Sequence, residues 1–462
     1  MAHADLYDYH EKQDFPSHKG AITGLLFVFG AFIVLGVYAI WNLWLMYETQ
    51  IMTIINSLNL PGFLTDNFLG IFLILGGLIF MSLLMAFGAS AAARRLGGTL
   101  IYIGAGLMNL LTWGIVVIAL FAGAPIMQAW PVMIPGILTL FMTLLLFTVF
   151  KDRVRRAGEI IKLTGQVCLD EKGVFVPPLL TMIFTLVSAL FFGAIIVFFT
   201  PHFADVVFFG AEATTEDLLS GGLGIVVYLF LTIFFYNFAY GTTSGVVYIY
   251  MRGRDPSLGD GVRASLNVIG GLIVLSIASV IVTIIRMVIR AISRESGAGG
   301  RAIGGLADGV IGWVWALINY FTIPAMVGEN LGAKDGIKRS ASLVKNNFVD
   351  VLIKETAVRW GFGVLAGMMF LGFALGGFLI GWVFPLSLVG NDPLLSALIF
   401  TVIFIVFAAI PSTLVMRTFD IVYITLLYVF IRKKDGDFTK TAIPASMTSQ
   451  LESAYRTAQS GN

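Results

Sequence analysis

The chain has 462 residues, of which 58% are hydrophobic and only 12% are charged, and its formal net charge is +2. Ordinary soluble domains carry roughly 25% charged residues, so a soluble fold of this length could not bury so much apolar surface. The small net charge provides no long-range field that would attract nucleic acid, and we expect no nucleic-acid partner.

The hydrophobic residues are grouped in runs of about 20, the length that a helix needs to cross ~30 Å of hydrocarbon. These runs predict an all-α fold, a polytopic integral membrane bundle with about ten transmembrane helices. We expect Pro411 to break the last run, which is too long for one crossing. The expected helices cover residues 21–47, 67–90, 98–123, 130–150, 177–200, 221–250, 262–290, 304–327, 360–384 and 394–431.

Lysine and arginine mark the cytoplasmic side, because short loops that carry them are retained there. Basic segments alternate along the chain with four segments that contain neither residue, 48–66, 124–129, 201–220 and 385–393. The first 20 residues lack the basic start and short apolar core of a signal peptide. We therefore expect both termini to be cytoplasmic and the protein to lie in the plasma membrane.

A charged stretch divides the chain into parts. We predict, in order, an N-terminal cytoplasmic tail, a four-helix membrane part, a cytoplasmic linker with a short amphipathic helix, a six-helix membrane part and a C-terminal cytoplasmic tail, at 1–20, 21–150, 151–176, 177–432 and 433–462. In the six-helix part, LGDGVRASL recurs loosely as LGAKDGIKRSASL. We expect Asp260 and Asp335 in these two segments to act as helix N-caps.

Three features in the second part carry a resemblance to a known family: Asn237, the segment RDPSLGDGVRASL from Arg254 to Leu266, and the segment IPAMVGENLGAKDGIKRSASL from Ile323 to Leu343. Residues 156–432 resemble an uncharacterised family of six-span prokaryotic membrane proteins, a domain of unknown function. Asn330 and the Ala-Lys pair that follows Gly332 depart from the family's pattern. The resemblance implies a prokaryotic membrane fold and implies no activity, and the four preceding helices lie outside it.

Arg417 and Asp420 are the strongest candidates for an intramembrane polar site. They lie three residues apart on one helical face within the last apolar run, and ionisable groups at that depth usually face a partner or a wet cavity. The alternatives are a pair that only satisfies itself, or a segment that leaves the membrane after Pro411. Asn237 and Asn319 could add polar groups to a pathway, although such side chains more often form hydrogen bonds between helices.

Four arginines between residues 286 and 301 contradict the charge rule, because this segment is expected outside. Arg286, Arg290 and Arg294 recur every four residues and so share one helical face. Snorkelling to the headgroups explains them better than voltage sensing. Asp308 follows closely and could neutralise one of these arginines at the outer interface.

Other patterns limit the possible functions. We find no catalytic or metal-binding pattern, and all four histidines lie outside the apolar runs, so we expect no enzyme activity, no metal and no cofactor. Glycines in the ninth expected helix predict close helix packing. We expect a self-assembling or accessory component of a membrane complex, as a homo-oligomer or subunit, with anionic lipid headgroups at the basic cytoplasmic loops. The alternative is a transporter or channel with a site near Arg417 and Asp420.

Overall fold

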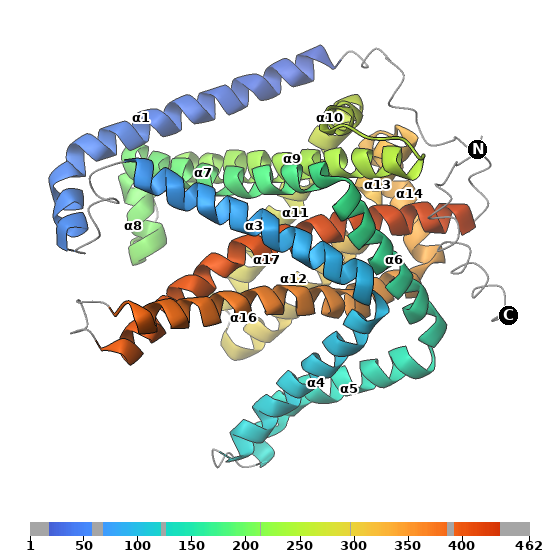
Figure 1. Cartoon of the computed structure of the whole chain (residues 1–462). Helices are drawn as coiled ribbons and strands as arrows, with labels where there is room; N and C mark the ends of the chain where they lie inside the picture. The colour runs from blue at the N-terminus through green and yellow to red at the C-terminus, as the bar shows by residue number, and fades with distance from the viewer. Residues whose placement is uncertain are drawn as a thin grey trace. The chain divides into compact units, whose positions relative to one another are not determined.

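Every element in the described part of the protein is a helix (Figure 1). The computed structural model describes residues 18–57, 68–121, 126–212, 214–295, 297–385 and 392–434. Within these ranges nine helices are long and apolar enough to cross a membrane, or ten if the bent pair Met133–Thr148 and Lys151–Asp170 is one span. The prediction of an all-α multi-pass membrane protein is thereby confirmed, while the sides of the termini stay a prediction.

The long helices coincide with the apolar runs. They are α1 (Lys19–Ser57), α3 (Phe68–Leu96), α4 (Gly98–Phe121), α5 (Ile126–Thr148), α7 (Val176–Phe199), α9 (Thr215–Met251), α11 (Ile269–Glu295), α12 (Gly297–Ile318), α16 (Arg359–Val383) and α17 (Pro393–Lys434). Large apolar side chains such as Leu110 and Phe27 are exposed on their outer faces. Lipid chains solvate such surfaces, so exposed leucine and phenylalanine are expected there.

Shorter helices connect the long ones. They are α6 (Lys151–Asp170), the 3₁₀ turn η1 (Lys172–Phe175), α8 (Pro201–Phe209), α10 (Leu258–Asn267), α13 (Thr322–Glu329), α14 (Ala333–Asn346), α15 (Phe348–Ile353) and the π-helical turn η2 (Lys354–Val358). The amphipathic helix expected in 151–176 is α6. Its apolar face is buried along most of its length, so α6 is an integral part of its unit.

The helices group into two compact units. The first contains α1 and α7 to α14, and the second contains α3 to α6, η1, α15, η2, α16 and α17, together with the segment Tyr250–Asp255. Both units are built from several separate stretches of the chain. This grouping differs from the consecutive parts predicted at 21–150 and 177–432, because α1 packs against α7 instead of the helices that follow it.

In the first unit, small residues bring α9 and α10 into close contact. A Cβ atom added at Gly261 of α10 would lie 2.5 Å from the carbonyl oxygen of Thr242 in α9. A Cβ atom at Gly245 would lie 2.6 Å from that of Ala264. The segment RDPSLGDGVRASL therefore provides a glycine-lined contact with α9, since only glycine permits such an approach.

The helix caps differ from the prediction. Ser257 is the N-cap of α10, in an extended conformation, and its hydroxyl accepts a hydrogen bond from the backbone N–H of Asp260. Asp260 is the third residue of the helix and its carboxylate returns a bond to the N–H of Ser257, which completes a capping box. Asp335 lies within the first turn of α14, which begins at Ala333, so it also is not an N-cap. There it faces the positive end of the helix dipole.

The helix expected at 304–327 is divided into α12 and α13. Pro324 lacks an N–H and its ring clashes with the preceding turn, which favours a break just before it. Phe321 lies in this break, and its backbone N–H donates to Ser340 Oγ at 2.8 Å. The hydroxyl of Tyr248 donates to the carbonyl of Pro324 at 2.8 Å. Ser340 of α14 thus satisfies a backbone N–H that the break releases, and Tyr248 connects α9 to the start of α13.

The second unit is built on two helical hairpins, α4 with α5 and α16 with α17, and α4 packs on α16 (Figure 1). In α16, Gly377 and Gly381 allow close contact with the backbone of α17. The expected break at Pro411 is wrong, because α17 is one continuous helix of 42 residues. Neighbouring helices can compensate for a proline inside a membrane helix.

Candidate functional site

Charged residues of the second unit gather where α15 passes through η2 into α16. The π-helical turn Lys354–Val358 interrupts an otherwise α-helical path. Such turns are rare and occur frequently at functional sites. Asp350 precedes Lys354 by four residues, about one helical turn. An acid and a base therefore lie one turn apart just before the apolar length of α16, and their side chains contact different neighbouring helices.

Lys354 is the most deeply buried lysine among the described residues, with only 1% of its side chain exposed. Its Nζ donates to Glu355 Oε1 at 2.9 Å and to the carboxylate of Asp420 in α17. Glu355 also accepts a hydrogen bond of 2.8 Å from the exposed Arg359. Burying a lone ammonium would cost several kcal/mol, so these two carboxylates are what makes the burial of Lys354 tolerable.

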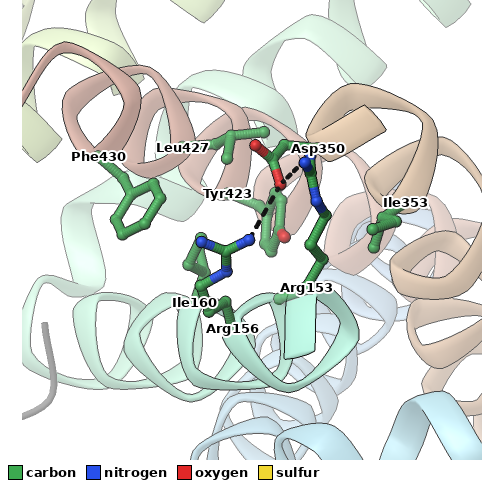
Figure 2. A pocket seen from close by; sticks show the side chains of 9 residues that line it. Arg153, Arg156, Ile160, Asp350, Ile353, Tyr423, Leu427 and Phe430 are labelled. Atoms are coloured by element: carbon green, nitrogen blue, oxygen red, sulfur yellow. Dashed lines mark ion pairs between the residues drawn. The ribbon is translucent and has the colours of Figure 1, made fainter. Parts of the chain in front are cut away.

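Asp350 makes a second charged contact, with α6. Its Oδ1 lies 3.5 Å from Arg153 Nη1 and 3.9 Å from Arg156 Nη2. Figure 2 shows both guanidinium groups converging on this carboxylate. A cavity of about 10 Å³ lies between them. That volume holds about one water molecule. Its lining is Arg153, Arg156, Ala157, Ile160, Asp350, Ile353, Tyr423, Leu427 and Phe430.

The two charged contacts connect three helical segments into one centre. Asp350 of α15 contacts α6, and Lys354 of η2 contacts α17. Tyr423, one turn beyond Asp420 on α17, lines the cavity. We name the residues Asp350, Lys354, Glu355 and Asp420 the charge centre. Its ion pairs fix α15 between α6 and α17, and its cavity can position a single water molecule.

A separate acidic group lies at the other end of α6. The hydroxyl of Tyr250 donates to Asp170 at 2.6 Å. Burial, with the neighbouring charges of Asp255 and Asp170, raises the pKa of Glu171 to about 7. Cys168 is buried in the same helix, and burial raises the pKa of its thiol far above the usual range. A thiol that stays protonated is a poor nucleophile.

The structure gives Asp420 a partner on another segment of the chain. Asp420 binds Lys354, 66 residues away in sequence, and is 33% exposed. Arg417 lies one turn before Asp420 on α17. The two residues thus share a helix as expected, but the contact that organises the site runs between helices. The proposed intramembrane role of Arg417 and Asp420 stays a prediction.

The predicted asparagines lie in the first unit. Asn237 Nδ2 donates to Ser276 Oγ in α11 at 2.9 Å. Asn319 lies just past the end of α12, and its Nδ2 donates to the carbonyl of Trp315 in that helix at 3.0 Å. Interhelical or intrahelical hydrogen bonds therefore use both amides. The bond of Asn237 is of the interhelical kind that the alternative described, and a role of Asn237 and Asn319 in a polar pathway stays a prediction.

The structure brings Arg286 and Asp308 together across α11 and α12. Arg286 Nε donates to Asp308 Oδ1 at 2.8 Å, and Arg290 Nε lies 3.6 Å from the same oxygen. One carboxylate thereby compensates two arginines. Both belong to the segment that is expected outside, although the charge rule would keep arginines on the cytoplasmic side. Their depth and side stay a prediction.

Sequence reasoning missed Asp350, Lys354 and Glu355 as site residues. The available signal was a local one: an acid and a base four residues apart, directly before an apolar run of helical length. Arg153 and Arg156 were likewise missed, within the linker predicted at 151–176. Their i, i+3 spacing places them on the same face of α6, from which they meet Asp350.

Residues 222–438 match the model of a family described as a family of unknown function (DUF6159). The matched segment begins within α9 and includes the charge centre, but it excludes α6. No match was found among curated proteins. The long apolar helices define the protein as a multi-pass α-helical membrane protein, and the family match confirms the resemblance to an uncharacterised family. The six spans of that family and the separate N-terminal part stay predictions.

Proposed function

We propose that this chain is a non-enzymatic membrane protein that serves as a structural or accessory component of a membrane complex, in the plasma membrane of a prokaryote. The observation that supports this proposal is that the charged groups of the charge centre bind one another and leave little free space beside them. Lys354 is enclosed by two carboxylates, and the cavity beside Asp350 measures about 10 Å³. Solute sites measure several hundred Å³, so this centre serves packing better than solute binding.

A charge centre that serves packing makes a specific thermodynamic prediction. Lys354→Met alone leaves the one-third exposed Asp420 without its cation and should lower stability by about 1–3 kcal/mol. A Lys354→Met, Asp420→Leu double variant should recover most of this loss, because Glu355 keeps Arg359 as its partner. Arg359→Gln, at a mostly exposed position, is the control and should change stability little. Thermal unfolding of the purified variants in detergent measures these differences.

Assembly is tested by the particle mass in lipid nanodiscs. A self-assembling component should form one defined multiple of the 50.2 kDa chain, and the double variant should keep that multiple. The same samples in liposomes should show no more ion or proton flux than empty liposomes. A monomer at all protein concentrations, with flux above this background, would contradict the proposal.

Transport of a small solute or ion is the second candidate, and one observation favours it. Asp420 and Glu355 are each about one-third exposed, while the lysine between them is buried on a π-helical turn. Carboxylates in that position could exchange Lys354 for a proton or a cation. Transport requires flux in the wild type that the folded double variant lacks and that Arg359→Gln retains.

A further inference from the structure

The length of α5 and the bend after it indicate how deep in the membrane the first turns of α6 lie. α5 has 23 residues, enough to cross the ~30 Å hydrocarbon core, and α6 follows it after a bend of 90°. With α5 as a crossing helix, α6 runs parallel to the membrane plane and starts where α5 leaves the hydrocarbon. The beginning of α6 then lies at the depth of the lipid phosphates.

This helix start is strongly basic. Of its first six residues four are cationic, Lys151, Arg153, Arg155 and Arg156, and one is acidic, Asp152. The N-cap residue Phe150 provides no side-chain hydrogen bond. The positive end of the helix dipole adds to these charges, so basic residues here destabilise the helix unless an anion is close.

Asp350 compensates this charge only in part. The cavity lining contains two arginines and one carboxylate, a net charge of +1. Both Arg–Asp350 distances, 3.5 and 3.9 Å, exceed the ~2.8 Å of a charge-assisted hydrogen bond. Arg156 Nε is buried and has no hydrogen-bond partner among the described groups. The two guanidinium groups therefore keep donors available for a second acceptor.

From this geometry we infer that Arg153 and Arg156 bind the phosphodiester group of an anionic phospholipid. Arg153 is 37% exposed and so reaches the mouth of the cavity, whereas Arg156 is largely enclosed. One phosphate oxygen has the size of the single water that the cavity holds, and the rest of the group remains at the mouth. One negative charge balances the +1 of the lining. This inference does not depend on the proposed function.

The test is native mass spectrometry of the full chain with added phosphatidylglycerol or phosphatidylcholine. Wild type should bind phosphatidylglycerol about tenfold more tightly than phosphatidylcholine. Arg153→Gln with Arg156→Gln should abolish this preference, and Arg156→Lys should keep part of it, since lysine retains the charge and loses the fork. Arg155→Gln is the matched control. It removes one positive charge, as each of the two cavity substitutions does, but from an exposed position outside the cavity lining, and it should keep the preference.

Asp350→Asn separates binding from folding, because it removes the competing carboxylate. It should tighten phosphatidylglycerol binding several-fold, a gain that misfolding cannot produce. Weaker binding in this variant, or equal losses in Arg155→Gln and the double variant, would overturn the inference in favour of diffuse surface attraction. Inorganic phosphate should compete only weakly; displacement of the lipid at equal concentration would overturn the lipid as the occupant.

Discussion

Lys354 illustrates how a single buried charge organises its surroundings. Its ammonium is almost fully removed from solvent, and carboxylates from its own turn and from α17 approach it. A lysine in this position is stable only while both acids stay close to its ammonium. The residue therefore makes the positions of α15 and α17 interdependent, and any conformational change there must rearrange these ion pairs.

Glu171 should make stability depend on pH. Its pKa in the folded protein is about 7, against an ordinary value of 4.5, because burial and two neighbouring acids disfavour the charged form. The folded state thus prefers the protonated carboxyl. This contribution to stability is fully present below the ordinary pKa and is lost as pH rises through about 7.

Glu171→Gln imitates the protonated carboxyl at every pH. Compared with wild type, the variant should unfold at a higher temperature at about pH 8 and at nearly the same temperature at about pH 4.5. Thermal unfolding in detergent over this pH range measures the difference. Glu159→Gln is the control, because Glu159 lies within α6 in a surface pair with Lys162. Parallel curves for Glu171→Gln and wild type would show that Glu171 does not titrate in this range.

Residue-level sites were only partly predictable. Asp420 was selected because an acid inside an apolar run is expensive, and that argument needs only local sequence. Its partner Lys354 is 66 residues away, and no spacing rule connects them. A helical spacing such as that of Arg417 and Asp420 predicts only which residues share one face of a single helix. The charge centre depends on contacts between different helices, which spacing does not predict.

At the scale of elements, glycines decide how closely α16 and α17 approach. A Cβ atom added at Gly377 would lie 2.6 Å from the carbonyl oxygen of Phe400, while at Gly376 it would meet nothing within 4 Å. Gly377→Ala should therefore force the two backbones apart, at a cost of about 1–3 kcal/mol. Gly376→Ala should be neutral or slightly stabilising, because alanine is the better helix former.

Thermal unfolding of both variants by fluorescence-detected size-exclusion chromatography measures this contrast. The neighbouring position is a matched control, because both changes add the same methyl group to the same turn of α16. Equal unfolding temperatures for the two variants would mean that α16 and α17 are not held in this close contact.

Helix positions were largely predictable, because the length of an apolar run directly reflects membrane thickness. Whether a helix breaks or continues at a proline was not predictable. α12 and α13 separate just before Pro324, but α17 continues through Pro411. Proline creates the same local defect in both places. The outcome depends on which neighbouring groups satisfy the released backbone, and that information comes from packing.

At the scale of the whole molecule, the number of crossings decides the sides of the termini. Nine crossings place them on opposite sides, and ten place them on the same side. The described helices allow both counts, and the difference lies in whether α5 crosses before α6 turns away at 90°. The basic residues at the start of α6 favour ten, since they would be retained on the cytoplasmic side.

Single-cysteine labelling decides between these topologies. In a Cys168→Ser background, Ala124→Cys lies before α5 and Arg155→Cys lies in the exposed face of α6. A membrane-impermeant maleimide should label the first variant on intact cells and the second only after permeabilisation, because α5 separates them. The unsubstituted background is the control for unspecific labelling. Labelling of both positions from the same side would mean that α5 does not cross the membrane, and the termini would then lie on opposite sides. The start of α6 would also no longer lie at the depth of the lipid phosphates.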